Sequence, residues 1–260
     1  MIDYSFSLYD LEYFLLILTR VSCFIFIAPF FSMQNTPRNV RVVLSFFTSI
    51  LLYQTLTPAP VVEYSTVLEY AIIIIKEAVS GLLLGFGATA CSSIVNFAGS
   101  IADMEIGLSM VNLMDPTTRQ NSSITGVLYQ YALMMMLIAT GMYRYLFGAL
   151  ADSFTLIPVN GAIFHGESLV NSVVRFLSEY VIIGFRIVLP VVCVMLLLNA
   201  VLGILAKVAP QLNMFAVGIQ LKVLVGLSVI FFVASLLPSA ADLIFTEMRE
   251  LIVAFVEGMR

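Results

Sequence analysis

The sequence has little of what covers the surface of a soluble protein. Only 11% of its 260 residues are charged, it has one histidine and no tryptophan, and 61% of its residues are hydrophobic. The mean hydropathy is +1.05. A globule of this size needs more polar surface than these residues supply. The composition therefore excludes an ordinary soluble domain and indicates an integral membrane or membrane-complex protein.

Residues that carry chemistry are also scarce. Cys23, Cys91 and Cys193 lie far apart within apolar runs, as small buried hydrophobic residues do. His165 has no second histidine with which to complete a zinc site. The sequence also lacks a phosphate-binding glycine loop, a dinucleotide fingerprint, a nucleophile with an adjacent base and a basic patch. We therefore expect no metal, no cofactor, no catalytic residues and no nucleic-acid partner.

Long apolar runs make up most of the chain. A helix needs about 20 apolar residues to cross a hydrocarbon core of about 30 Å. Runs of about this length or longer cover residues 10–33, 40–57, 67–98, 124–150, 177–206 and 214–237. Their leucine, isoleucine, valine and methionine are continuous rather than alternating, which favours helices over a β-barrel. The sequence predicts an all-α, membrane-type bundle of about six long helices in a single domain, residues 1–260.

The charged residues that fall within these runs include Arg20, the pair Lys76 and Glu77, and Arg186. Each would cost about 2.5–3.5 kcal/mol at the centre of a bilayer, so they should face protein or water. One interpretation is a path for ions or substrate. The other is that they pair with neighbouring subunits or reach the interface. We favour the second because most of the helices have no acid that could belong to a relay.

Glycines predict where helices approach closely. Gly81 and Gly85 have the four-residue spacing that brings helix backbones together, and we also assign Gly99 to helix packing. An alternative for Gly85 is that, with Gly87, it bends its helix.

A polar turn is predicted between the fifth and sixth runs, at Pro210, Gln211 and Asn213. Proline ends the helix there, and the uncharged amides can both donate and accept hydrogen bonds. The turn either contacts a partner or lies in solvent.

The stretch IADMEIGLSMVNLMDPTTRQNSS, residues 101–123, is too polar to continue the membrane and too apolar for an ordinary loop. Gly107 and Pro116 are expected to end regular helix, and apolar side chains fill the space between them. From the residues alone, one interpretation is ordinary buried packing at the end of a helix.

Three blocks in order resemble the FliR/SctT family, the export-gate subunits of flagellar type III secretion and of injectisomes. They are TRVSCFIFIAPFFSMQNTPRNVRVVLSF, AGSIADMEIGLSMVNLMDPTTRQNSS and LAKVAPQLNMFAVGIQLKVLVG. The resemblance covers nearly the whole chain. The chain departs from it at Glu105, where many relatives have glutamine.

The resemblance implies a hetero-oligomer in the bacterial inner membrane at the flagellar basal body. A FliR-type subunit assembles with copies of FliP and FliQ into a ring around a pore for unfolded proteins, with FlhB around the ring and FlhA beneath it. Residues 1–175 would correspond to a FliP-like part and residues 176–260 to a FliQ-like hairpin. Because such rings are lifted largely out of the lipid, the apolar runs would bury against subunits.

The resemblance also implies that residues 101–123, here called the plug segment, project into the pore and close it. The residues predicted to form the plug are Ile106, Gly107, Leu108, Met110, Val111, Leu113, Met114, Asp115 and Pro116. Methionine is unbranched and adaptable, so it can seal around irregular neighbours.

The function expected from these observations is a pore-forming, non-enzymatic subunit of the flagellar protein export gate. An injectisome subunit of the SctT type is the nearest alternative. A self-contained transporter of ions or small molecules would need an acid relay and internal repeats, and a membrane-embedded enzyme would need convergent polar residues. The sequence provides neither set of features.

Overall fold

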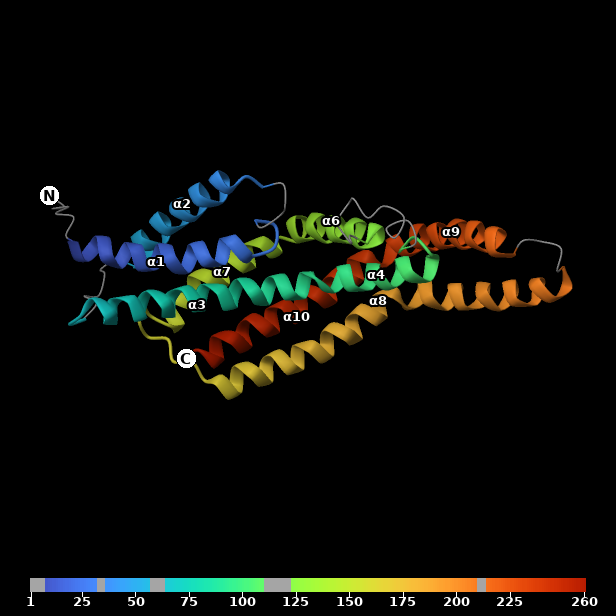
Figure 1. Cartoon of the computed structure of the whole chain (residues 1–260). Helices are drawn as coiled ribbons and strands as arrows, with labels where there is room; N and C mark the ends of the chain where they lie inside the picture. The colour runs from blue at the N-terminus through green and yellow to red at the C-terminus, as the bar shows by residue number, and fades with distance from the viewer. Residues whose placement is uncertain (1–7, 32–35, 57–63, 110–122, 210–213) are drawn as a thin grey trace. The chain divides into compact units, whose positions relative to one another are not determined.

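A computed structural model describes residues 8–31, 36–56, 64–109, 123–209 and 214–260. Every regular element in these ranges is helical (Figure 1), as the sequence predicted. In chain order the elements are α1 (Leu8–Ile27), α2 (Arg38–Leu56), α3 (Val67–Ser92), α4 (Ile94–Ile106), α6 (Ile124–Ala139), α7 (Met142–Leu156), α8 (Gly166–Val208), α9 (Met214–Val233), the short 3₁₀ helix η1 (Ala234–Leu236) and α10 (Leu237–Gly258). The chain divides into two compact units, residues 1–91, 141–176 and 247–260 in the first, and residues 92–140 and 177–246 in the second.

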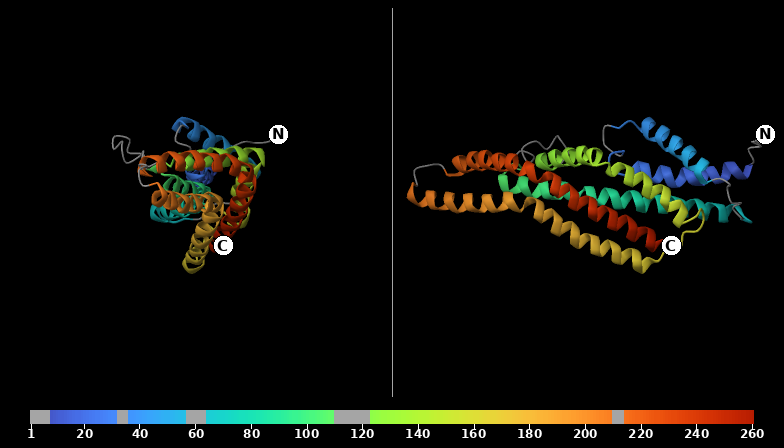
Figure 2. Two further views of the ribbon diagram at one scale, coloured as in Figure 1. Left: turned by 90° about the vertical axis from the view of Figure 1, so that its right-hand side faces the viewer. Right: turned by 180° about the vertical axis from the view of Figure 1, so that it is seen from behind.

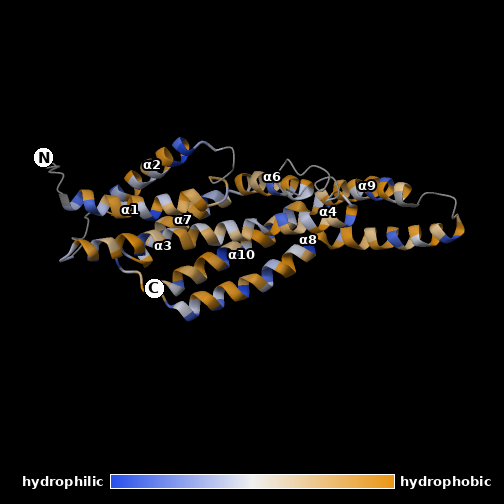
Figure 3. Ribbon diagram, viewed as in Figure 1, coloured by the Kyte–Doolittle hydropathy of each residue, from blue (hydrophilic) through white to orange (hydrophobic). Residues whose placement is uncertain are grey.

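Within the described ranges, four helices are long and apolar enough to cross a membrane, or up to five if the bent pair α6 and α7 counts as one span. The spans differ in extent from the predicted runs. Residues 166–208 form one helix that continues through Pro190, and the last span reaches Gly258. The run at 124–150 is interrupted at Gly141, which has a positive φ of 73°. Figure 3 shows orange, apolar residues along each of these helices, with white and blue residues among them.

The first unit is centred on α1, which packs against α2 and α3. Its buried side chains include Leu16, Val21 and Phe24, which recur at three- to five-residue spacing and place one stripe of the helix in the core. Most of α2 is exposed: its large side chains Val43 and Phe47 are 66% and 60% accessible. An apolar surface of this kind suits lipid or another subunit better than water.

A buried ion pair connects α1 with α3. Arg20 Nε donates to Glu77 Oε2 at 2.7 Å, and both side chains are fully buried. Arg20 Nη1 also donates to the carbonyl oxygens of Ser153 and Ile157, at 3.1 and 3.0 Å. Glu77 Oε1 accepts the backbone N–H of Asn160 at 3.0 Å. These two charges therefore face protein, and their partners belong to the same chain.

The second unit is built around α4, which packs on α6 and α9. One stripe of α4 (Ile94, Ala98, Ala102, Ile106) is completely buried. Helix α9 lies close to this stripe of α4: a Cβ on Gly226 of α9 would lie 2.6 Å from Ile106 Cγ1. The fit between α4 and α9 therefore requires glycine on the α9 side.

Candidate functional site at the ends of helices α4 and α6

The plug segment, residues 101–123, starts in the last turns of α4 and continues past the end of that helix. Ile106, the last residue of α4, is fully buried, whereas Gly107 and Leu108 are partly exposed. Six of the predicted plug residues lie outside the described residues: Met110, Val111, Leu113, Met114, Asp115 and Pro116. The structure therefore describes the helix ends on either side of these residues. We call residues 107–122, between α4 and α6, the linker.

Gly107 ends α4 at the position where the sequence predicted that regular helix stops. Its φ of 93° lies in the left-handed region, and its N–H donates to the carbonyl oxygen of Asp103 at 3.0 Å. Glycine adopts this conformation at little cost, whereas a residue with a Cβ is strained there. The chain therefore leaves α4 in a defined direction.

Ser123 begins α6 as its N-cap. Its Oγ accepts the N–H of Gly126 at 2.8 Å, which satisfies one of the free donors in the first turn. The same hydroxyl donates to Asp103 Oδ2 at 2.7 Å. One side chain thus caps α6 and bonds it to α4.

Asp103 is the centre of this arrangement, and it is only 3% exposed. Its carboxylate accepts hydrogen bonds from the Ser123 hydroxyl, from the Thr125 hydroxyl and from the Thr125 N–H, the last at 3.2 and 3.3 Å from the two oxygens. Hydrogen bonds to an ionised carboxylate are roughly twice as strong as neutral ones. A single buried side chain therefore joins the two ends of the linker.

Gly99 lies where the two helices cross. A Cβ at this position would overlap the backbone of Gly126, so the helices touch backbone to backbone. One turn before Gly99, Asn96 Nδ2 donates to Gln130 Oε1 at 3.2 Å. We call this pair of helix ends, residues 96–106 and 123–130, the stem. It is closed by small residues at its centre and by hydrogen bonds on either side.

Gly81 and Gly85 lie in the other unit, on the face of α3 that meets α1. A Cβ on Gly81 would overlap the carbonyl group of Arg20. A Cβ on Gly85 would lie 3.0 Å from the carbonyl oxygen of Phe24 and 3.2 Å from Ile27 Cβ. Both glycines therefore lie where the two helices are in close contact, and α3 continues through them to Ser92.

The predicted hairpin turn, Pro210, Gln211 and Asn213, lies outside the described residues. The flanking helices are described, with α8 ending at Val208 and α9 beginning at Met214.

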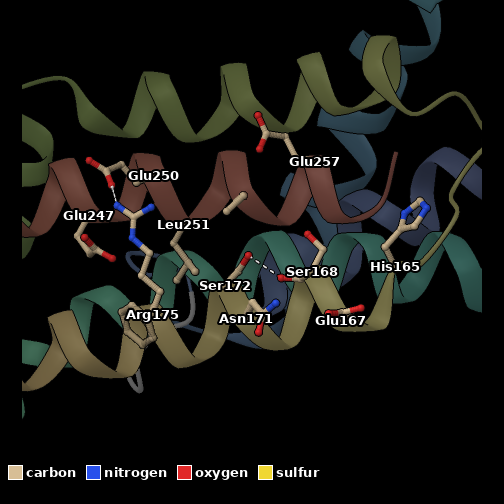
Figure 4. Close-up of a pocket in the computed structure, with 12 residues that line it drawn as sticks. His165, Glu167, Ser168, Asn171, Ser172, Arg175, Glu247, Glu250, Leu251 and Glu257 are labelled. Carbon is tan, nitrogen blue, oxygen red and sulfur yellow. Dashed lines mark hydrogen bonds and ion pairs between the residues drawn. The ribbon is translucent and has the colours of Figure 1, made fainter.

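A polar groove that the sequence did not predict lies between the first turns of α8 and the last turns of α10, which run side by side (Figures 1 and 2). Side chains of His165, Glu167, Asn171, Glu247 and Glu257 line it (Figure 4). The ion pair of Arg175 and Glu250, 2.7 Å apart and mostly exposed, crosses it. No group of His, Cys, Asp or Glu within the described residues is arranged to hold a metal ion.

Comparison with known proteins gives the family. The model of a family described as bacterial export proteins, family 1, matches residues 11–248. The flagellar biosynthetic protein FliR of Bacillus subtilis (strain 168) is 32% identical over 250 residues, which cover 95% of this chain and 93% of the relative. The proteins of the same name from Aquifex aeolicus (strain VF5) and Escherichia coli (strain K12) are 26% and 24% identical, and each match covers 93% of this chain and 92% of the relative. The resemblance seen in the three sequence blocks is thereby confirmed, and the chain belongs to family 1 of the bacterial export proteins.

Proposed function

We propose that this protein is a pore-forming subunit of the flagellar type III export gate, located in the inner membrane at the basal body. The observation that carries the proposal is the match to flagellar FliR proteins over more than nine-tenths of the chain. The four or five candidate spans within the described residues support a location in the membrane. Because the relatives named above are flagellar, they favour the flagellar apparatus over an injectisome.

The partners in this proposal are FliP-like and FliQ-like subunits, which complete the ring, together with FlhB-like and FlhA-like components. Residues 1–175 take the place of a FliP-like subunit and residues 176–260 that of a FliQ-like hairpin. Support comes from the apolar surfaces that the described helices leave exposed, such as Val43 and Phe47 of α2. Unfolded flagellar proteins are the exported substrates.

In this proposal the plug segment closes the channel. Support comes from the apolar sequence of the segment and from the hydrogen bond and backbone contact that hold the two flanking helix ends together. Apolar side chains in a narrow opening exclude water and therefore ions. The charges of Arg20 and Glu77 offer little support for an ion path, since they bond to each other and to backbone groups of their own unit.

The function is tested by deleting the gene and measuring export of flagellar proteins into the medium. Export should disappear and return when the unmodified gene is restored. Export that continues without the gene would contradict the proposal.

The plug is tested by replacing Met110, Leu113 and Met114 together with serine. Without three large apolar side chains, water should wet the opening, and cells or vesicles that carry the assembled complex should leak small ions. Ion flux is normalised to the amount of intact complex. Glu105→Ala, placed before the apolar cluster, should leak less. A triple variant as tight as the unmodified complex would show that these residues are ordinary packing.

A further inference from the structure

Helix α8 has an arginine in the middle of an exposed apolar surface. Arg186 is exposed, and three large apolar residues lie within about one turn of it on the same side of the helix. These residues, Ile182, Phe185 and Leu189, are 51%, 49% and 57% accessible. Among the residues that the structure describes, no ion pair or hydrogen bond involves the Arg186 side chain. Arg186 therefore differs from Arg20, whose partners belong to its own chain.

The opposite side of α8 packs within the second unit. A Cβ on Gly184 would overlap the ring of Phe97 in α4, so the two helices are in close contact there. Ile187 and Val188 of the same turn are buried. The helix is thereby held against α4 in one rotational setting, in which Arg186 is directed outward.

The backbone at the same position also lacks a partner within its helix. Pro190 has no N–H, so the carbonyl oxygen of Arg186, four residues earlier, does not receive the hydrogen bond that continues an α-helix. One turn of α8 thus presents a cation, which needs acceptors, beside a carbonyl oxygen, which needs a donor. Hydrocarbon provides neither group, and a charged side chain is costly there.

The other two cations of α8 are compensated within their own chain. Arg175 pairs with Glu250 at 2.7 Å. Lys207 lies in the last turn, where the partial negative charge of the helix end favours a cation. Arg186 lies about 30 Å from either end of α8, too far from both for such an effect.

We infer that this face of α8, residues 182–189, is a docking surface for an apolar helix of another subunit that carries a carboxylate opposite Arg186. Charge complementarity specifies the acid, because a guanidinium and a carboxylate form two parallel hydrogen bonds. The apolar neighbours specify the rest of the partner helix, since large apolar side chains are best covered by others of their kind. This docking rests on the proposed assembly into a hetero-oligomer, and it adds the chemistry by which one subunit is recognised.

The occupant is identified by photo-cross-linking in the assembled complex. The photoreactive amino acid p-benzoylphenylalanine replaces Leu189, and the cross-linked residue is located by mass spectrometry. We expect a cross-link to a helix of another subunit that has an aspartate or glutamate within two turns of the attachment point. A cross-link to lipid alone, a cross-link to a helix without such an acid, or no cross-link at all overturns the inference.

The need for the charge is tested by competition. Variant and unmodified chains with different tags are expressed together at equal levels, the complex is purified through the cross-linked subunit, and the ratio of the two chains is measured. Arg186→Met keeps a long, helix-favouring side chain and leaves the partner's carboxylate without its counter-charge. We expect this variant to compete at least about tenfold less well than the unmodified chain, and Arg186→Lys to lie between them.

The matched control is Arg175→Met on the same helix, because the acid that pairs with Arg175 belongs to its own chain. Its competition ratio should stay near that of the unmodified chain. If lipid covered this face instead, Arg186→Met would compete equally well or better, because removing the charge lowers the cost of contact with hydrocarbon. That result overturns the inference.

An exchange of charges tests the pair directly. Arg186→Glu alone should compete less well than Arg186→Met, because two carboxylates then face each other. Combining Arg186→Glu with arginine in place of the identified acid should restore most of the lost ratio. No recovery in the exchanged pair overturns the inference.

Failure of this inference differs from failure of the proposed function. If export continues without the gene, the export function is wrong, whereas the cross-link still decides whether a helix with a carboxylate covers α8. If export requires the gene and Arg186→Met competes as well as the unmodified chain, the function stands and the docking surface is wrong.

Discussion

Gly99 of α4 and Gly126 of α6 meet backbone to backbone, so that a single Cβ on Gly99 has no space. We predict that Gly99→Val lowers the free energy of unfolding by at least about 1–3 kcal/mol, the usual cost of overpacking. The control is Gly148→Ala in α7, where a Cβ would have nothing within 4 Å. That change should be neutral or slightly stabilising, because alanine favours helix by up to about 1 kcal/mol. The midpoint of thermal unfolding is measured for both variants in the detergent-purified complex, with size exclusion as the readout. Equal midpoints for the two variants would contradict the close crossing.

Two ion pairs among the described residues, one buried and one exposed, can be compared. We predict that Glu77→Gln destabilises the protein by about 3–5 kcal/mol, because it leaves the fully buried guanidinium of Arg20 without its counter-charge. Glu250→Gln breaks the pair with Arg175, whose side chain is 72% exposed, and should cost less than about 1 kcal/mol. The midpoint of thermal unfolding again provides the measurement. A similar small effect of both changes would mean that the buried pair adds no stability.

The predicted turn between α8 and α9 provides a third test. We expect the double change Gln211→Leu and Asn213→Leu to weaken docking of the FlhB-like partner while the chain stays inserted. Loss of a hydrogen bond in a buried contact costs about 1–3 kcal/mol, which is a visible loss of co-purified partner. Pull-down yield and export are compared with the unmodified chain. If neither changes, the turn lies in solvent.

Exposed apolar helix faces predict dependence on partners. We expect the chain made alone to be poorly stable, and co-expression with FliP-like and FliQ-like subunits to rescue it, because binding to the folded state shifts the folding equilibrium. Size exclusion in mild detergent compares the chain made alone with the chain co-expressed with these subunits. A monodisperse monomer that ignores both partners would contradict the proposed assembly.

Sequence reasoning was most successful where a signal is local. Apolar runs predicted the helices, and the glycine at position 107 predicted the end of α4. The break at Gly141 was missed because hydrophobic residues predominate on both sides of it, although Arg144 follows three residues later. The extension of α10 to residue 258 was also missed, although buried Ile244, Met248 and Leu251 follow a helical spacing. The charged residues on the other face of α10 interrupt the apolar run, so the run alone did not predict this part of the helix.

The candidate site was less predictable because its contacts are distant in sequence. Asp103 was visible as an acid in an apolar stretch, but its partners follow 20 or more residues later, beyond any helical period. A serine and a threonine at the start of the next helix were the available signal, since Ser123 is also a recognisable N-cap. The pairing of Arg20 with Glu77, separated by 57 residues, had no such marker.

The contacts of Arg20 also constrain the synthesis of the protein. Glu77 follows 57 residues after Arg20, and the backbone acceptors Ser153 and Ile157 follow 133 and 137 residues after it. At a bacterial translation speed of about 5–20 residues per second, the arginine of the first helix waits roughly 3–11 s for its counter-charge and about 7–27 s for its last acceptor. During this interval α1 carries an unneutralised charge that costs about 2.5–3.5 kcal/mol at the centre of a bilayer. Insertion of this chain is therefore favoured if the first helix stays in a polar environment, at the insertion machinery or the bilayer surface, until α3 and then α7 emerge from the ribosome.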